Sequence, residues 1–301
     1  MRRAPPYGEV TTRRYNPPMP ERQPFSLVTS SGRTVHGMVD LPDQPGPRPT
    51  ILDCHGFKGF MEWGFHPYLA ELLCARGFTV VRFNFTSSGM QPADDLVTDE
   101  EAFATTSFGE DAEEIRDVLA ALQDGRVAGG RVDGDRLGLL GHSRGGGTSI
   151  LTAGSHPWSQ RLKALVTWAA VGTFDRIGER EKAQWRHLGA LPIVNARTGQ
   201  HLRLDASLLD DGERNKEAYD VEAAATRVEA PWLLIHGSED ETVPVVEAHA
   251  LASTFTGDAE ALIVEGGSHT FGAQHPFVGP TPHLIEAMNA TQAWFRRHLG
   301  S

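Results

Sequence analysis

Residues 137–147 read Leu137-Gly138-Leu139-Leu140-Gly141-His142-Ser143-Arg144-Gly145-Gly146-Gly147. An apolar run stops at Gly-His-Ser-Arg-Gly, and a glycine-rich segment compatible with a helix follows. Gly-x-Ser-x-Gly between a strand and a helix is typical of a tight turn that holds a serine hydroxyl above the edge of a sheet. Gly141 and Gly145 are small because the strand and the helix pass close to each other there. The stretch predicts Ser143 as a nucleophile; the alternative is a serine that only caps the following helix.

Apolar strands alternate with helices on both sides of this stretch. We expect strands at residues 50–54, 78–85, 137–142, 164–171, 231–237 and 261–265, and helices at 69–76, 110–122, 245–255 and 282–299. Continuous apolar strands that alternate with helices are typical of a mostly parallel sheet with helices on both faces. Ahead of them, residues 25–29 and 34–39 flank a Ser-Ser-Gly turn and predict an antiparallel hairpin.

Two segments do not fit this alternation. Residues 1–24 are rich in Pro and Arg and predict an extended N-terminal arm. Residues 172–228 are polar, show only short helical windows and are too long for a plain connection. We interpret 172–228 as a cap inserted over the carboxyl edge of the sheet, which leaves 25–171 and 229–301 as the α/β core.

The composition excludes several classes of protein. The 301 residues carry 28 basic and 39 acidic side chains, a net charge of -11, which argues against a nucleic-acid or anionic-membrane partner. No apolar run approaches the ~20 residues of a membrane span, and no apolar stretch follows Arg2 and Arg3 as in a secretory signal. Cys54 and Cys74 are expected to be buried free thiols, and no cysteine–histidine cluster has metal-ligand spacing. We therefore expect a cytoplasmic monomer or homodimer without a bound metal.

A serine nucleophile needs a base and an orienting carboxylate, and in this architecture they follow in the order Ser, acid, His. Asp240 comes directly after the strand at 231–237 and is the predicted acid, with its neighbours Glu239 and Glu241 as alternatives. His269 follows the last strand and is the predicted base. The main competitor for the base is His275; His142, His55 and His236 are weaker candidates.

Acyl transfer also needs hydrogen-bond donors for the oxyanion. We expect one from the Arg144 amide at the helix N-terminus and one from the Phe57 amide in His55-Gly56-Phe57, or from Lys58 if the loop is shifted by one residue. Other side chains are assigned with core packing or solvation as the alternative. We expect an apolar acyl or aryl pocket lined by Trp63, Trp168 and Trp185, with Phe60 and Phe65. Arg197 is a candidate contact for a substrate carboxylate. The polar strand residues Asp53, Arg82 and Asn84 are expected to pair among themselves.

The motifs His55-Gly56-Phe57 and Gly141-His142-Ser143-Arg144-Gly145-Gly146, with Asp240 and His269, together resemble the α/β-hydrolase superfamily. Within it the chain is most similar to dienelactone-hydrolase-like and cinnamoyl/feruloyl-esterase-like carboxylesterases, which have relatives among peptidases of the prolyl-oligopeptidase type. The resemblance implies an eight-stranded, mostly parallel sheet, a Ser-His-Asp triad and no cofactor. Ser143 stands where dienelactone hydrolase itself has a cysteine, which argues against dienelactone substrates.

The expected function is therefore that of a serine carboxylesterase. The substrate would be a small-molecule ester of small or medium size, aryl (hydroxycinnamoyl) esters included, cleaved through an acyl-enzyme on Ser143. The same triad also runs amide and thioester hydrolysis, so both stay open. A non-catalytic ligand receptor on a hydrolase scaffold is the alternative from another class.

Overall fold

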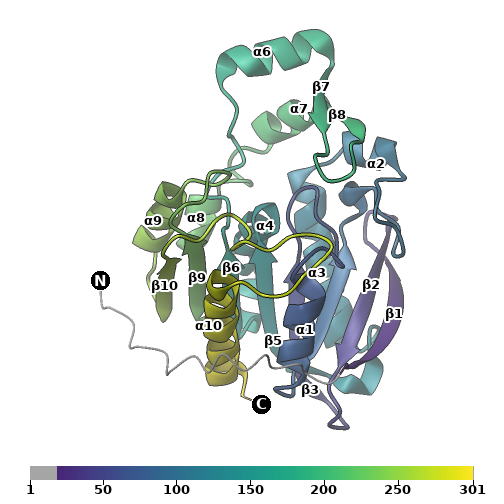
Figure 1. Cartoon of the computed structure of the whole chain (residues 1–301), viewed down its shortest axis with the longest axis vertical. Coiled ribbons are helices and arrows are strands. Elements are labelled where there is room, and N and C mark those ends of the chain that lie inside the picture. Colours follow the sequence, from purple (N-terminus) through teal and green to yellow (C-terminus); the bar gives the residue numbers. More distant parts are fainter. Residues whose placement is uncertain (1–18, 301) are drawn as a thin grey trace.

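One eight-stranded sheet organises the chain, in the order β1-β2-β4-β3-β5-β6-β9-β10 (Figure 1). The structure is a computed structural model and describes residues 19–300. β2 pairs antiparallel with β1 and β4, and the remaining neighbours pair parallel, so the predicted mostly parallel sheet is confirmed. The strands are β1 Glu21–Val28, β2 Thr34–Leu41, β3 Arg48–Cys54, β4 Thr79–Asn84, β5 Val132–His142, β6 Ala164–Trp168, β9 Trp232–Gly237 and β10 Ala259–Val264.

Helices cover both faces of the sheet, and neighbouring residues of one strand serve different faces. Leu139 packs with α3 and α4, whereas Leu140 packs with α1 and α10, because successive side chains of a strand point to opposite sides. The helices of the body are α1 His66–Cys74, α3 Phe108–Gln123, α4 Arg144–Ala153, α5 Trp158–Arg161, α8 Val221–Ala225, α9 Val245–Ser253 and α10 Pro282–Leu299. The loop after β4 contains the short helices η1 Thr86–Ser88 and α2 Glu100–Ala104, and η2 Gly129–Arg131 precedes β5.

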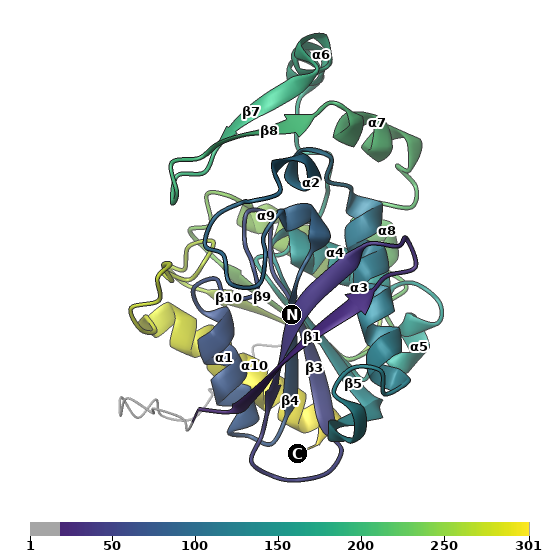
Figure 2. The same ribbon diagram turned by 90° about the vertical axis from the view of Figure 1, so that its right-hand side faces the viewer.

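The segment after β6 stands apart from the sheet. Helix α6 Glu179–Leu188, strands β7 Ala190–Val194 and β8 His201–Asp205, and helix α7 Ser207–Arg214 lie together at one end of the molecule (Figures 1 and 2). β7 and β8 form an antiparallel hairpin that the sequence patterns do not predict. Helix α8 packs against α4 in the body, although it lies within residues 172–228. We use "cap" below for α6, β7, β8 and α7.

Two expectations about the body are wrong. β1 begins at Glu21, so residues 21–24 belong to the sheet; the rest of the expected arm, up to residue 18, lies outside the described residues. Asp53, Arg82 and Asn84 do not pair among themselves. Arg82 binds Asp40 at 2.8 Å and Asp53 binds His66 at 2.8 Å, while Asn84 accepts a hydrogen bond from the Met61 amide. β2, α1 and the loop before α1 supply these nearer partners, and their adjacency is set by the fold and not by the sequence order.

Two further features concern the cysteines and the helices. Cys54 and Cys74 are both buried and free. Within residues 19–300, no helix combines the length and the apolar composition needed to cross a membrane.

Candidate active site

Ser143 occupies a strained turn between β5 and α4. Its backbone has φ 57° and ψ -121°, a region that non-glycine residues rarely adopt. A Cβ at Gly141 would lie 2.4 Å from the carbonyl oxygen of Gly145, and a Cβ at Gly145 would lie 2.3 Å from that of His55. Only glycine fits at both positions, and the close passage of β5, α4 and the loop after β3 presents the serine hydroxyl at the carboxyl end of the sheet.

The structure brings Ser143, His269 and Asp240 together. His269 Nε2 lies 2.9 Å from Ser143 Oγ, and His269 Nδ1–H donates to Asp240 Oδ2 at 2.8 Å. Asp240 follows β9, and His269 follows β10, so adjacent parallel strands deliver both side chains to one edge. In this arrangement the serine hydroxyl donates to an imidazole whose other nitrogen is fixed by a carboxylate, which is the geometry for removing a proton from the nucleophile.

Asp240 is held in its ionised form. Its other oxygen, Oδ1, accepts hydrogen bonds from the amides of Thr242 (2.9 Å) and Val243 (2.8 Å). Burial by itself would raise the pKa of Asp240, but the hydrogen bonds from His236, His269 and the Val243 amide outweigh it and hold the pKa well below its usual value. Its sequence neighbours Glu239 and Glu241 are exposed, and neither contacts His269 among the described interactions.

The competing histidines lie elsewhere. His275 accepts a hydrogen bond from the Gly64 amide and lies 3.3 Å from Asp95, away from Ser143. His55 donates to the Gly56 carbonyl through Nδ1 and accepts from the Phe85 amide through Nε2. His142 donates through Nε2 to the carbonyl oxygen of His269 at 3.0 Å, and burial lowers its pKa well below the usual value, so it is neutral. His142 therefore supports the loop that carries the base.

Two backbone amides that belong to residues lining the cavity beside Ser143 make no hydrogen bond among those described for residues 19–300. The loop after β3 lies against the nucleophile, because a Cβ at Gly56 would be 2.9 Å from Ser143 Cβ. Phe57 and Arg144 line the same cavity as Ser143, whereas Lys58 does not. Among the hydrogen bonds of residues 19–300, neither the Phe57 amide nor the Arg144 amide has an acceptor. Both predicted donors are thus available to a tetrahedral oxyanion.

A cavity of about 690 Å³ opens over Ser143 and extends under the cap. Beside the nucleophile it is lined by rings that the sequence analysis did not single out. Phe108 stacks on Phe174 with ring centroids 4.3 Å apart and meets Tyr219 edge-on at 5.9 Å. The cap contributes a second apolar group, Trp185, Leu204, Leu208 and Leu209. These residues come from six separate segments between positions 108 and 219, so no local pattern in the sequence could have grouped them.

Of the three tryptophans expected in the pocket, Trp185 lines the cavity and the other two do not. Trp168 is fully buried below the site, where its ring packs against Phe65 and its Nε1–H donates to Thr291 Oγ1 at 2.9 Å. Trp63 packs against Phe65 and His275 outside the cavity. The prediction is wrong for Trp168 because the alternation of β6 points its ring toward α10, and for Trp63 because its ring packs between Phe65 and His275.

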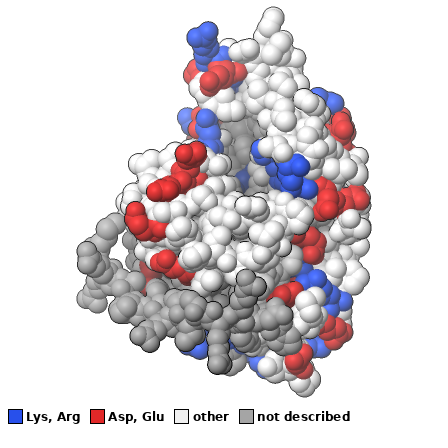
Figure 3. Space-filling model, in the orientation of Figure 1, with Lys and Arg blue, Asp and Glu red and all other residues white. Residues whose placement is uncertain are grey.

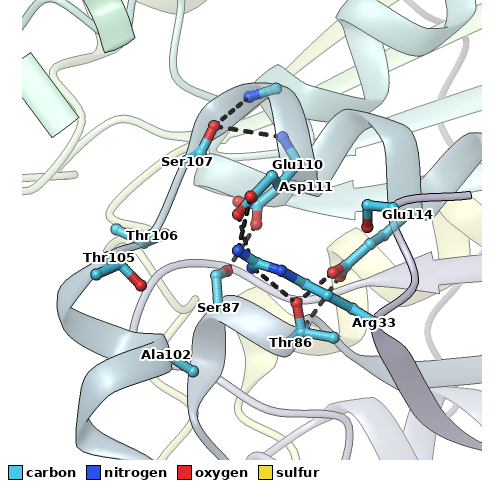
Figure 4. A network of polar contacts seen from close by, with 12 residues as sticks. Arg33, Thr86, Ser87, Ala102, Thr105, Thr106, Ser107, Glu110, Asp111 and Glu114 are labelled. Atoms are coloured by element: carbon cyan, nitrogen blue, oxygen red, sulfur yellow. Dashed lines mark hydrogen bonds and ion pairs between the residues drawn. The ribbon is translucent and has the colours of Figure 1, made fainter. Parts of the chain in front are cut away.

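The guanidinium group of Arg144 is anchored beside the oxyanion loop. It lies 4.7 Å from the ring centre of Phe108 and 5.8 Å from that of Phe57, and its Nη2 binds Asp111 at 2.7 Å. Asp111 belongs to a polar network on α3 that includes Arg33 and Glu114 (Figure 4). Arg197, which the sequence offers as a candidate contact for a substrate carboxylate, donates to the Asp95 carbonyl and lies outside the cavity. Lys and Arg side chains also border the hollow below the cap (Figure 3).

Residues 63–301 match the prolyl oligopeptidase family. The chain belongs to this family. Together with the strand order and the site geometry, this makes the protein a serine hydrolase with the α/β-hydrolase fold. Within residues 19–300 there is no group of three or more His, Cys, Asp or Glu side chains suited to a metal ion.

Two similar proteins have been named, one as a peptidase and the other as a serine hydrolase. The chain is 25% identical to the "Uncharacterized peptidase YuxL" of Bacillus subtilis (strain 168); the match covers 91% of this chain and 39% of YuxL. It therefore spans about two fifths of the length of that relative. It is also 26% identical to "Serine hydrolase BPHL" of Mus musculus, over 82% of this chain and 84% of that protein.

Solved structures share the fold at low identity. Est1E from Butyrivibrio proteoclasticus with bound ferulic acid superposes with a TM-score of 0.69 at 18% identity, over 92% of this chain and all of that one. The esterase domain of a Rhodothermus marinus protein gives 0.62 at 20% identity, over 93% of this chain and all of the domain. Dienelactone hydrolase from Anabaena variabilis ATCC 29413 gives 0.61 at 18% identity, over 93% and 99%.

Proposed function

We propose that this prolyl oligopeptidase family member is a carboxylesterase acting on small or medium esters whose acyl part is apolar or aromatic. The observation that carries the proposal is the position of Ser143, which is hydrogen-bonded to His269 and through it to Asp240, in the lining of a cavity that also includes Phe57, Phe108 and the cap leucines. Rings and aliphatic side chains beside the nucleophile favour burial of an apolar acyl group.

The proposed reaction has two halves. Ser143 Oγ attacks the ester carbonyl carbon while His269 Nε2 takes the hydroxyl proton, and the carbonyl oxygen becomes an oxyanion held by the Phe57 and Arg144 amides. Collapse of this intermediate breaks the bond to the leaving alcohol, which receives the proton from His269. Water then attacks the acyl-enzyme in the same way, with His269 again as the base, and releases the acid.

Amide hydrolysis is the second candidate. It is favoured by the family match and by the printed name of YuxL, which calls that relative a peptidase. Ester hydrolysis is placed first because the cap covers part of the cavity, whose volume of about 690 Å³ suits a small molecule.

The test is hydrolysis of p-nitrophenyl esters from acetate to decanoate, with methyl ferulate and aminoacyl p-nitroanilides alongside. Ser143→Ala and His269→Ala are run in parallel with the wild-type protein. We expect ester turnover that exceeds anilide turnover and is lost by at least about 10³-fold in both variants. Faster turnover of the anilides would make the protein a peptidase, and activity retained in Ser143→Ala would remove the nucleophile assignment.

A further inference from the structure

His236 lies at the end of β9 and its side chain is fully buried beside the triad acid. Its Nε2 is 2.8 Å from the Val243 carbonyl oxygen and 3.3 Å from Asp240 Oδ2. A carbonyl oxygen can only accept a hydrogen bond, so Nε2 carries the hydrogen. That hydrogen is shared with the same carboxylate oxygen that receives the bond from His269.

The surroundings of Nδ1, the other ring nitrogen of His236, determine whether the ring can carry a second proton. Nδ1 is buried and has no hydrogen-bond partner among the described residues. A second proton on the ring would leave an N–H group in the interior without an acceptor, which is costly. His236 is therefore a neutral imidazole with its hydrogen on Nε2, and it acts as a donor and not as a base.

Asp240 consequently has a donor on every side. Thr242 and Val243 hold Oδ1 through their amides. His269 Nδ1–H holds Oδ2 at 2.8 Å, and Nε2–H of His236 makes a second, longer contact with Oδ2 at 3.3 Å. When His269 takes the proton of Ser143, its positive charge lies 2.8 Å from this carboxylate, so the position and residual charge of Oδ2 determine how basic His269 is.

We propose that His236 is a positioning residue of the catalytic site, whose Nε2–H fixes Oδ2 of Asp240 and offsets part of its charge, which tunes the basicity of His269. The inference rests on the proposed function, in which Ser143 is the nucleophile and His269 its base. His236 does not touch the reacting atoms; it acts through Asp240.

Other ionisable groups surround this end of the sheet without competing for the contact. His142, on β5, is neutral and binds the His269 carbonyl, and Glu247, on α9, pairs with Arg176. In the part of the chain that the structure describes, none of the remaining ones hydrogen bonds to Asp240 or His236: they are Glu239 and Glu241 in the same loop, His249 on α9, Glu265 after β10, and His283 and Glu286 on α10.

The test compares His236→Leu, which removes the donor, with His236→Gln, whose amide nitrogen reaches a similar position. We expect His236→Leu to lower kcat for p-nitrophenyl butyrate about tenfold. We also expect the acid limb of its kcat/KM profile to move up by about half a pH unit, because a carboxylate without the donor favours protonated His269 more. His236→Gln should recover most of both effects.

Controls separate the possible failures. Wild-type protein that neither reacts with a fluorophosphonate nor hydrolyses the ester would contradict the proposed function itself. With an active wild type, an unmoved acid limb in His236→Leu, or a Gln variant no better than Leu, would mean that His236 only supports the fold. If neither variant folds, ¹⁵N NMR of wild-type histidines decides. The inference requires His236 to carry its hydrogen on Nε2 alone, and a doubly protonated ring or an Nδ1–H form would overturn it.

Discussion

Ser143 keeps a backbone conformation that costs on the order of 1–3 kcal/mol, and its glycine neighbours show how the fold accommodates it. Gly145, in the first turn of α4, touches the backbone of the loop after β3: a Cβ there would meet the His55 carbonyl oxygen at 2.3 Å and that of Cys54 at 2.6 Å. Backbone atoms cannot swing aside as a side-chain tip can. The distance between nucleophile and oxyanion loop therefore depends on the absence of one methyl group.

Gly145→Ala should separate α4 from β3 and disturb both the turn at Ser143 and the Phe57 amide. We expect a loss of about 2 kcal/mol or more in the free energy of unfolding and slower labelling of Ser143 by a fluorophosphonate. Urea denaturation and labelling kinetics measure the two effects. Gly257→Ala is the matched control, because a Cβ at Gly257 meets nothing within 4 Å. Equal behaviour of the two variants would show that the contact at Gly145 is not tight.

At the scale of elements, helix α3 carries a buried carboxyl group whose protonation is coupled to folding. Glu114 accepts a hydrogen bond from the Thr86 amide at 3.0 Å and also bonds the Thr86 hydroxyl (Figure 4). Burial, and next to it the charge of Asp111, raises the pKa of Glu114 from 4.5 to about 8. The folded protein thus holds a proton that the unfolded chain releases, so the free energy of unfolding contributed by this group falls as pH rises from about 4.5 to about 8.

Glu114→Gln keeps the shape of the protonated side chain and cannot ionise. We expect it to raise the free energy of unfolding by on the order of 2 kcal/mol at pH 8 and to change it little near pH 4.5. Urea denaturation across this range is the measurement, with Glu113→Gln, an exposed neighbour on α3, as the control. A gain that is the same at both ends of the pH range would exclude ionisation of Glu114 as its cause.

An element can be predicted from the sequence when the residues that define its ends lie within or next to it, and not when distant contacts define it. The last helix was predicted at residues 282–299 and forms as Pro282–Leu299, because proline in its first turn and Gly300 behind it mark both ends locally. The sequence does not predict the hairpin β7–β8, because Pro192 within a strand argues against one and the buried side chains of β8 pack against the distant loop after β4. The triad residues follow strand ends that are apolar and easily recognised, whereas the cavity rings meet only once the whole chain is folded.

On the scale of the whole molecule, the cap and the body share one cavity, and several contacts join them. The side chain of Gln200, in the turn of the cap hairpin, bonds both the amide and the carbonyl of Val97. Arg203 on β8 pairs with Glu101 on α2, and Arg176 before α6 pairs with Glu247 on α9. The cap is thus fixed to the loop after β4, and the segment that leads into it is fixed to α9, so that the apolar side chains of the cap form one wall of the cavity over Ser143.

Leu209 on α7 lines the part of the cavity that the cap provides, so a larger side chain there should shorten the space for an acyl chain. Excluding about two methylene groups, at about 0.8 kcal/mol each, corresponds to roughly tenfold in kcat/KM. We therefore expect Leu209→Trp to lower the ratio of decanoate to acetate ester turnover about tenfold. Leu188→Trp, at an exposed position of α6 outside the cavity lining, is the control and should keep the wild-type ratio. If both variants keep that ratio, the acyl chain does not reach Leu209, and the cap does not set the acyl preference.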